Sequence, residues 1–162
     1  GHILTNAHVV GNAVKVRVVT SGKREKLVGE VLRVDRRRDV AVLRLEDVPD
    51  DVVPVVLPVR KDEPRVGEDV FAIGAPRLTR LQDTVTKGIV SANRYDRHLR
   101  LPFIQADVDI YGGNSGGPLL DANGNIIGMS VLGFYVSTDT LGGLNWFIPV
   151  QDALEKLNIQ YE

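Results

Sequence analysis

Residues 112–120 read GGNSGGPLL, with two glycines on each side of an Asn-Ser pair. Glycine loses more conformational freedom on folding than any other residue, so this density needs a reason. A serine hydroxyl attacks a carbonyl only when a base takes its proton, and the resulting oxyanion needs N–H donors close by. Glycines before Ser115 permit the tight path that turns N–H groups inward, and those after it let a substrate approach. The stretch predicts a nucleophile loop with the N–H groups of Gly113 and Ser115 as oxyanion hole; the alternative is a plain glycine-rich turn before a strand.

A serine nucleophile needs a base, and the chain has three histidines. His98 lies in the charged stretch RYDRHLRL, which predicts an exposed loop, and His2 stands at the start of the chain. His8 lies in ILTNAHVV, where a strand-like run ends and the chain turns. A lone histidine in an apolar context is more often structural, but the small neighbouring residues and the turn favour His8 as the base.

A third group must orient the base and stabilise its charged form. Asp39 immediately precedes VAVLRLE, a segment apolar enough to be a buried strand. A carboxylate at the mouth of that strand would be half-buried and would need a partner. An Asp that merely starts the strand is the alternative, but the joint occurrence of His8, Asp39 and Ser115 in this order favours a catalytic triad.

The elements that must position these residues are predicted to be mostly β-strands. Short segments rich in Val and Ile are punctuated by turn residues, which is typical of strands; they span 13–19, 26–35, 40–46, 69–75, 84–92, 103–110 and 125–133. Lys15 and Arg17 share one face of the first of them. The Asn-Gly pair within 121–125 predicts a hairpin turn. Only 150–159 has helical spacing, and many strands without intervening helices favour a barrel or a sandwich.

Composition limits the function classes. The 162 residues are enough for one domain or two small fused subdomains, and the apolar and charged fractions, 43% and 25%, are ordinary for a globular protein. A net charge of −1 gives no electrostatic footprint for nucleic acid. The absence of cysteine excludes disulfides, thiolate zinc sites and a cysteine nucleophile. The longest apolar run, 52–59, is short and broken by prolines, so no membrane span is expected.

Five segments, ILTNAHVV, DVAVLRL, TVTKGIVSA, GGNSGGPLLDANGNIIGMSV and GLNWFIPV, resemble in order and spacing those of trypsin-like serine proteases of the high-temperature-requirement (Deg/Htr) type. The resemblance covers nearly the whole chain. It implies an all-β fold of two antiparallel β-barrels with the site in the cleft between them, and a short C-terminal helix. It also implies His8 as general base, Asp39 as orienting acid, Ser115 as nucleophile, and no metal or cofactor.

The resemblance divides the chain into a partial first barrel over 1–60, a second barrel over 61–149 and a helix over 150–162. The family has two strands ahead of its His segment, so the first barrel is expected to be incomplete, and to be closed by a preceding segment or by another copy in a homo-oligomer. The peptide-binding PDZ modules common in the family are not expected here. Tyr111-Gly112 stands where the family has Asn-Pro, which predicts a less preorganised loop.

Substrate specificity depends on the position six residues before Ser115, which is Asp109. In trypsin-type enzymes a carboxylate at this offset attracts Arg or Lys, whereas Deg/Htr-type relatives prefer small aliphatic side chains. The alternative, which we favour, is that Asp109 and Asp107 lie on a solvated strand face. Four other residues are expected to contact the substrate. Val131, Leu132 and Gly133 are predicted to form an edge strand that pairs with the substrate backbone. Asn145 is predicted to form part of the pocket wall.

The sequence therefore predicts a serine endopeptidase that hydrolyses polypeptides, in particular unfolded proteins, through an acyl-enzyme. By resemblance it would work in the periplasm or cell envelope. The alternative is a catalytically silent peptide-binding or chaperone-like module on a protease fold, because the first barrel lacks strands. The complete set of triad candidates favours the enzyme.

Overall fold

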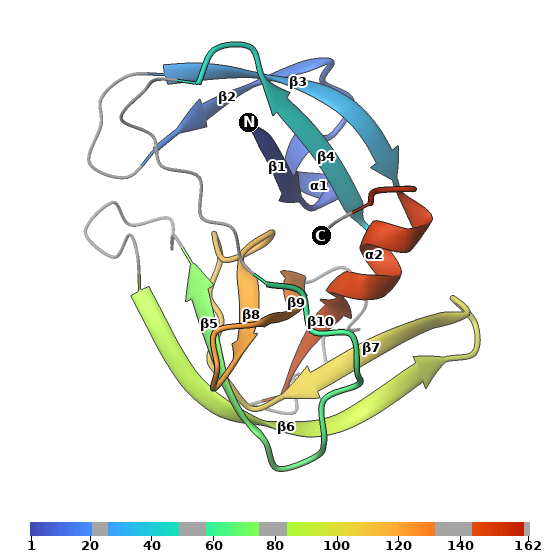
Figure 1. The fold of residues 1–162 in the computed structure, drawn as a ribbon. Helices are drawn as coiled ribbons and strands as arrows, with labels where there is room; N and C mark the ends of the chain where they lie inside the picture. Colours follow the sequence, from blue (N-terminus) through green and yellow to red (C-terminus); the bar gives the residue numbers. More distant parts are fainter. Residues whose placement is uncertain (21–25, 49–57, 75–83, 132–143, 161–162) are drawn as a thin grey trace. The chain divides into compact units, whose positions relative to one another are not determined.

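The structure, a computed structural model, describes residues 1–20, 26–48, 58–74, 84–131 and 144–160. The chain forms two compact units, Gly1–Val56 and Leu57–Glu162. Each unit has a sheet of its own (Figure 1). Each also has its own cluster of buried hydrophobic residues.

The first unit is an antiparallel sheet of four described strands with one short helix. The strands are ordered β1-β4-β3-β2. The elements are β1 (His2–Thr5), α1 (Ala7–Val10), β2 (Lys15–Val19), β3 (Lys26–Asp35) and β4 (Val40–Leu45). In β2 the predicted alternation is observed, since Lys15 and Arg17 are exposed while Val16 and Val18 are partly buried. Those valines pack against a core made by α1 and β4, which ties the helix to the sheet.

The second unit is a closed antiparallel barrel in the order β10-β7-β6-β5-β8-β9, followed by a helix (Figure 1). Its elements are β5 (Asp69–Gly74), β6 (Thr84–Asp96), β7 (Leu101–Ala106), β8 (Pro118–Asp121), β9 (Ile126–Val131), β10 (Asn145–Pro149) and α2 (Val150–Lys156). The interior is filled by buried aliphatic side chains and Phe147. The helix α2 packs against β9 and β10.

The prediction of a mostly β chain with a short C-terminal helix is confirmed. The predicted apolar face of α2 is buried, with Val150, Ala153, Leu154 and Leu157 all in the core. The helix α1 was not expected, because its four residues are too few to show a helical period.

The predicted strand at 103–110 is too long. Strand β7 ends at Ala106, although burial still alternates beyond it, with Val108 and Ile110 buried and Asp107 and Asp109 exposed. Asp107 still donates its backbone N–H to the carbonyl of Ile89 at 3.3 Å, but the N–H of Ile89 donates to the side-chain Oδ1 of Asp107 at 2.6 Å in place of a backbone carbonyl. A period-two burial pattern therefore persists without a regular strand.

The predicted hairpin at 121–125 joins β8 to β9. Gly124 has φ +81°, a left-handed conformation that glycine adopts without a steric penalty. The carboxylate of Asp121 accepts the N–H groups of Asn123 and Asn125, both at 2.9 Å, which closes the turn. Among the described residues, no helix is long and apolar enough to cross a membrane.

Candidate active site

The short helix α1 carries His8, and its N-terminus is capped by a residue distant in the sequence. The first N–H groups of a helix lack partners within it. Asn6 occupies the N-cap position but makes no side-chain cap. Instead, Oδ1 of Asp39 accepts the backbone N–H of His8 at 2.7 Å. One carboxylate oxygen thus fixes the backbone that presents the imidazole.

The second oxygen of the same carboxylate fixes the imidazole itself. Oδ2 of Asp39 lies 2.6 Å from Nδ1 of His8. A carboxylate in this position accepts the hydrogen bond, which favours the tautomer of a neutral imidazole with its proton on Nδ1 and its lone pair on Nε2. The side chain of His8 keeps 30% of its surface exposed whereas that of Asp39 keeps 1%. The pair is thus a partly exposed imidazole oriented by a buried carboxylate.

The backbone of Asp39 is held in a left-handed conformation, with φ +58°. Asp tolerates this region better than most residues, but it still costs free energy that the surroundings must offset. The buried side chain of Asn6 donates from Nδ2 to the carbonyl of Asp39 at 3.0 Å. The sequence predicts a half-buried Asp39, whereas Asp39 is fully buried. It does not predict the contact with Asn6; the available signal was an amide at the end of the strand-like run before His8.

In the second unit the nucleophile loop is a turn that needs glycine at defined positions. The N–H of Asn114 donates to the carbonyl of Tyr111 at 2.9 Å, and Gly113 within this turn has φ +111°. Gly116, directly after Ser115, has φ +85°. Both conformations are rare for residues with a Cβ. These two glycines allow the loop to reverse direction on either side of the serine.

Gly117 has a packing role in addition to the room for a substrate that the sequence predicts for the glycines after Ser115. A Cβ on Gly117 would lie 2.3 Å from the carbonyl oxygen of Ile73 in β5, so the missing side chain lets the loop pack on its own barrel.

The predicted oxyanion donors have no competing partner within the described part of the chain. Neither the N–H of Gly113 nor that of Ser115 donates to a backbone or side-chain acceptor there. Gly113 is exposed and Ser115 is half-buried. An oxyanion hole requires N–H donors that no acceptor of the protein already occupies.

The residues predicted to contact substrate differ in burial, in hydrogen bonding and in whether the structure describes them. Val131 is buried at the end of β9, opposite Trp146, while Leu132 and Gly133 lie outside the described residues. Asn145 uses its side chain within the barrel, since Nδ2 donates to the carbonyl of Val108 at 2.8 Å.

The side chain of Asp109 is exposed, and its carbonyl accepts the hydroxyl of Thr86 at 2.7 Å. Asp109 therefore shares a solvent-facing row with Asp107.

The three predicted catalytic residues are divided between the units. His8 and Asp39 are in contact in the first unit, and Ser115 lies in the second. Within the described ranges, no group of three or more His, Cys, Asp or Glu side chains is arranged to hold a metal ion.

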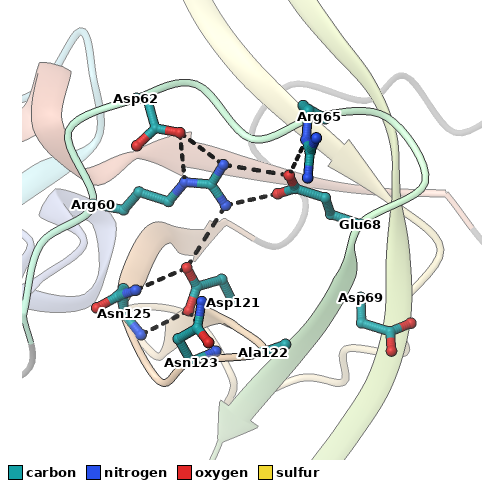
Figure 2. Close-up of a pocket in the computed structure, with 9 residues that line it drawn as sticks. All are labelled: Arg60, Asp62, Arg65, Glu68, Asp69, Asp121, Ala122, Asn123 and Asn125. Carbon is teal, nitrogen blue, oxygen red and sulfur yellow. Dashed lines mark hydrogen bonds and ion pairs between the residues drawn. The ribbon is translucent and has the colours of Figure 1, made fainter.

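A separate hollow of about 440 Å³ on the second unit contains none of these residues. Figure 2 shows the guanidinium of Arg60 at its centre, between three carboxylates. Its nitrogens lie 2.9 Å from Asp62, 2.6 Å from Glu68 and 3.6 Å from Asp121. Arg65 contacts Glu68 from the other side at 2.6 Å. Two guanidinium groups are thus paired with three of the four carboxylates that line the hollow.

The ion pairs shift the pKa values of Glu68 and Arg60 away from their usual values. Hydrogen bonds from Arg60 and then Arg65 lower the pKa of Glu68 to about 2, and hydrogen bonds to Glu68 and Asp62 raise the pKa of Arg60 above its usual range. The cluster is a structural network rather than a second catalytic centre.

Comparison with known proteins gives consistent matches. The family model of the trypsin-like peptidase domain matches residues 1–129. The "Probable periplasmic serine endoprotease DegP-like" of Hahella chejuensis is 39% identical over 160 residues, which cover 98% of this chain and 33% of that protein. Serine protease HTRA4 of Mus musculus is 42% identical over 139 residues, which cover 82% of this chain and 28% of that protein. This chain thus spans about a third of the length of these curated relatives.

Among solved structures, the chain is similar to the HtrA-type protease AlgW with decapeptide. The TM-score is 0.81 at 35% sequence identity, over 98% of this chain and 47% of that one. The chain is therefore similar to an HtrA-type protease in fold as well as in sequence.

Proposed function

Because this chain belongs to the trypsin-like peptidase family, in its HtrA-type branch, we propose that it forms the catalytic part of a serine endopeptidase that cleaves polypeptides. The single observation that carries the proposal is the pairing of His8 and Asp39. Both carboxylate oxygens of Asp39 are committed to His8, one to its backbone N–H and one to Nδ1. A buried acid that fixes a histidine tautomer is what a serine nucleophile requires of its base.

The proposed reaction uses three side chains and two backbone donors. Ser115 Oγ attacks the scissile carbonyl carbon while its proton passes to Nε2 of His8. The oxyanion that forms accepts hydrogen bonds from the N–H groups of Gly113 and Ser115. His8 then gives the proton to the leaving amine, and an acyl-enzyme ester on Ser115 remains. A water molecule, deprotonated by His8, hydrolyses this ester and regenerates the serine.

The alternative of a silent peptide-binding module is less well supported. Such a module needs neither a histidine oriented by a buried carboxylate nor a loop with two N–H groups that have no acceptor among the described residues. Both features carry conformational costs, including the left-handed backbone of Asp39.

Substrate class and location form a second part of the proposal. The decapeptide in the AlgW structure supports polypeptide ligands, and we extend this to unfolded proteins. The exposed carboxylate of Asp109 supports cleavage after small aliphatic residues rather than after Arg or Lys. The name of the Hahella chejuensis relative supports a periplasmic or cell-envelope location.

Covalent labelling tests the proposal in the natural protein. A fluorophosphonate should label Ser115, and Ser115→Ala should abolish labelling and casein hydrolysis, because loss of a triad member typically costs on the order of 10⁴ to 10⁶ in rate. Ser91→Ala, which removes a hydroxyl from β6, is the matched control and should keep full activity. Sequencing the products tells whether cleavage follows small aliphatic or basic residues. A Ser115→Ala variant within tenfold of the wild-type rate would overturn the assignment.

A further inference from the structure

We propose that Ser130 is a positioning residue that aims the N–H of Ser115 at the oxyanion; this inference rests on the proposed function. Ser130 lies in β9, and 1% of its surface is exposed. It belongs to the strand beside the nucleophile loop and was not singled out from the sequence.

Three hydrogen bonds join Ser130 to the loop. Its N–H donates to the carbonyl of Gly117 at 2.9 Å, and its carbonyl accepts the N–H of Gly116 at 3.1 Å. Its hydroxyl donates to the carbonyl of Asn114. The first two bonds are made by backbone, which any residue at this position supplies. The third depends on the serine side chain alone.

The hydroxyl acts on the oxyanion donor through the geometry of one peptide bond. The carbonyl of Asn114 and the N–H of Ser115 belong to the same planar trans peptide unit, so they point in opposite directions. The carbonyl is held by the Ser130 hydroxyl and by the N–H of Gly117 at 2.9 Å. The N–H of Ser115 therefore points away from the Ser130 hydroxyl, and it has no acceptor among the described residues.

The side chain of Asn114 limits rotation of this peptide from the other side. Asn114 is 3% exposed and packs over Gly74 so closely that a Cβ there would lie 2.3 Å from its Cγ. With its side chain packed and its carbonyl bonded, Asn114 has little freedom to turn. A buried hydroxyl is costly without a partner, so the Ser130 hydroxyl and the Asn114 carbonyl stabilise each other in this orientation.

The experiment compares transition-state binding with substrate binding in Ser130→Ala. Removing one oxyanion donor costs about 10²- to 10³-fold in kcat. A misdirected donor should cost less, and we expect kcat to fall about 10- to 100-fold with KM nearly unchanged. The affinity for a peptide boronate, which forms a tetrahedral adduct on Ser115, should fall by the same factor. In a Ser115→Ala background, the affinity for an uncleaved peptide should not change.

Three further variants separate positioning from folding. Ser130→Thr keeps the hydroxyl and should restore most of kcat. Ser130→Cys keeps the size but donates weakly, so it should lose kcat and provides the test if Ser130→Ala does not fold. Ser91→Ala should match the wild type in every assay, and thermal unfolding checks each variant.

Two results would overturn the inference. One is a Ser130→Ala or Ser130→Cys variant whose kcat and boronate affinity stay within twofold of the wild type. The other is an equal loss of peptide and boronate affinity, which would indicate general disruption of the site. If the wild-type protein is not labelled at Ser115, the proposed function is wrong and this inference is wrong with it. That failure is distinguishable from a failure of the inference alone, in which Ser115 is labelled in the wild-type protein.

Discussion

At the residue scale, Asp39 combines two tasks in one carboxylate, because it caps the helix that carries His8 and also holds the imidazole. The two tasks respond differently to substitution. Asparagine keeps a carbonyl oxygen that can accept the N–H of His8, so the cap should survive. Its NH₂ group can only donate, so beside Nδ1 it would favour the imidazole tautomer with the proton on Nε2.

Asp39→Asn should therefore separate catalysis from stability. We expect kcat/KM near neutral pH to fall about 10⁴-fold, because Nε2 no longer accepts the proton of Ser115. The melting temperature should stay close to that of the wild type. Asp107→Asn is the matched control, since Asp107 also accepts a backbone N–H but has no histidine partner among the described residues. An active Asp39→Asn together with an inactive Asp107→Asn would show that another carboxylate orients the base.

The contact between His8 and Asp39 could be predicted from the sequence, whereas the residues that support it could not. His8, Asp39 and the glycines around Ser115 follow from what a serine nucleophile needs, so residue type and order were enough to propose them. The partners that hold them were missed. Asn6 contacts a carbonyl 33 positions away, and Ser130 contacts one 16 positions away. A single polar side chain in an apolar run indicates that a partner exists but not which one.

At the element scale, the segment that precedes β5 is not a regular strand, but it is bonded to the β8–β9 hairpin. Arg60 donates its backbone N–H to the carbonyl of Ile126 at 3.1 Å, and its guanidinium lies between the carboxylates of Glu68 and Asp121 (Figure 2). Charged residues in a loop are usually solvated, so this network could not be predicted from the sequence. Strand positions were predicted more reliably, because alternation is a local pattern.

Glu68→Gln should weaken this attachment in a pH-dependent way. The pKa of Glu68 is about 2 in the folded chain against 4.5 for the free side chain, because Arg60 and Arg65 favour the ionised form. Its contribution is complete above pH 4.5 and is lost as the pH falls towards 2, since the unfolded state then binds more protons. At pH 7 we expect the free energy of unfolding to fall by about 1 to 2 kcal/mol.

Denaturant unfolding at several pH values measures the effect. The difference between wild type and Glu68→Gln should shrink steadily between pH 4.5 and pH 2. Glu46→Gln removes an exposed ion pair with Lys15 and should leave stability nearly unchanged, because exposed pairs are screened by solvent. A constant difference across this pH range would show that the Glu68 charge is not responsible.

At the scale of the whole molecule, the proposed catalytic groups come from two units with separate cores. The core of the first unit includes Val10 of α1 and Leu43 of β4, so it supports the helix that presents His8. The core of the second includes Leu119 of β8, which follows the nucleophile loop closely. The proposed base and the proposed nucleophile are each positioned by the unit to which they belong.

Because the two units have separate cores, we expect a substitution in one core to destabilise that unit and not the other. Leu43→Ala should cost about 2 to 5 kcal/mol through lost burial and the cavity left behind. Hydrogen exchange should accelerate in β1 to β4 while the slowest amides of β5 to β10 keep their protection. Leu119→Ala should produce the reverse pattern. Hydrogen–deuterium exchange with peptide-level resolution measures both, and equal acceleration in both units after either change would show that the chain opens as one cooperative body.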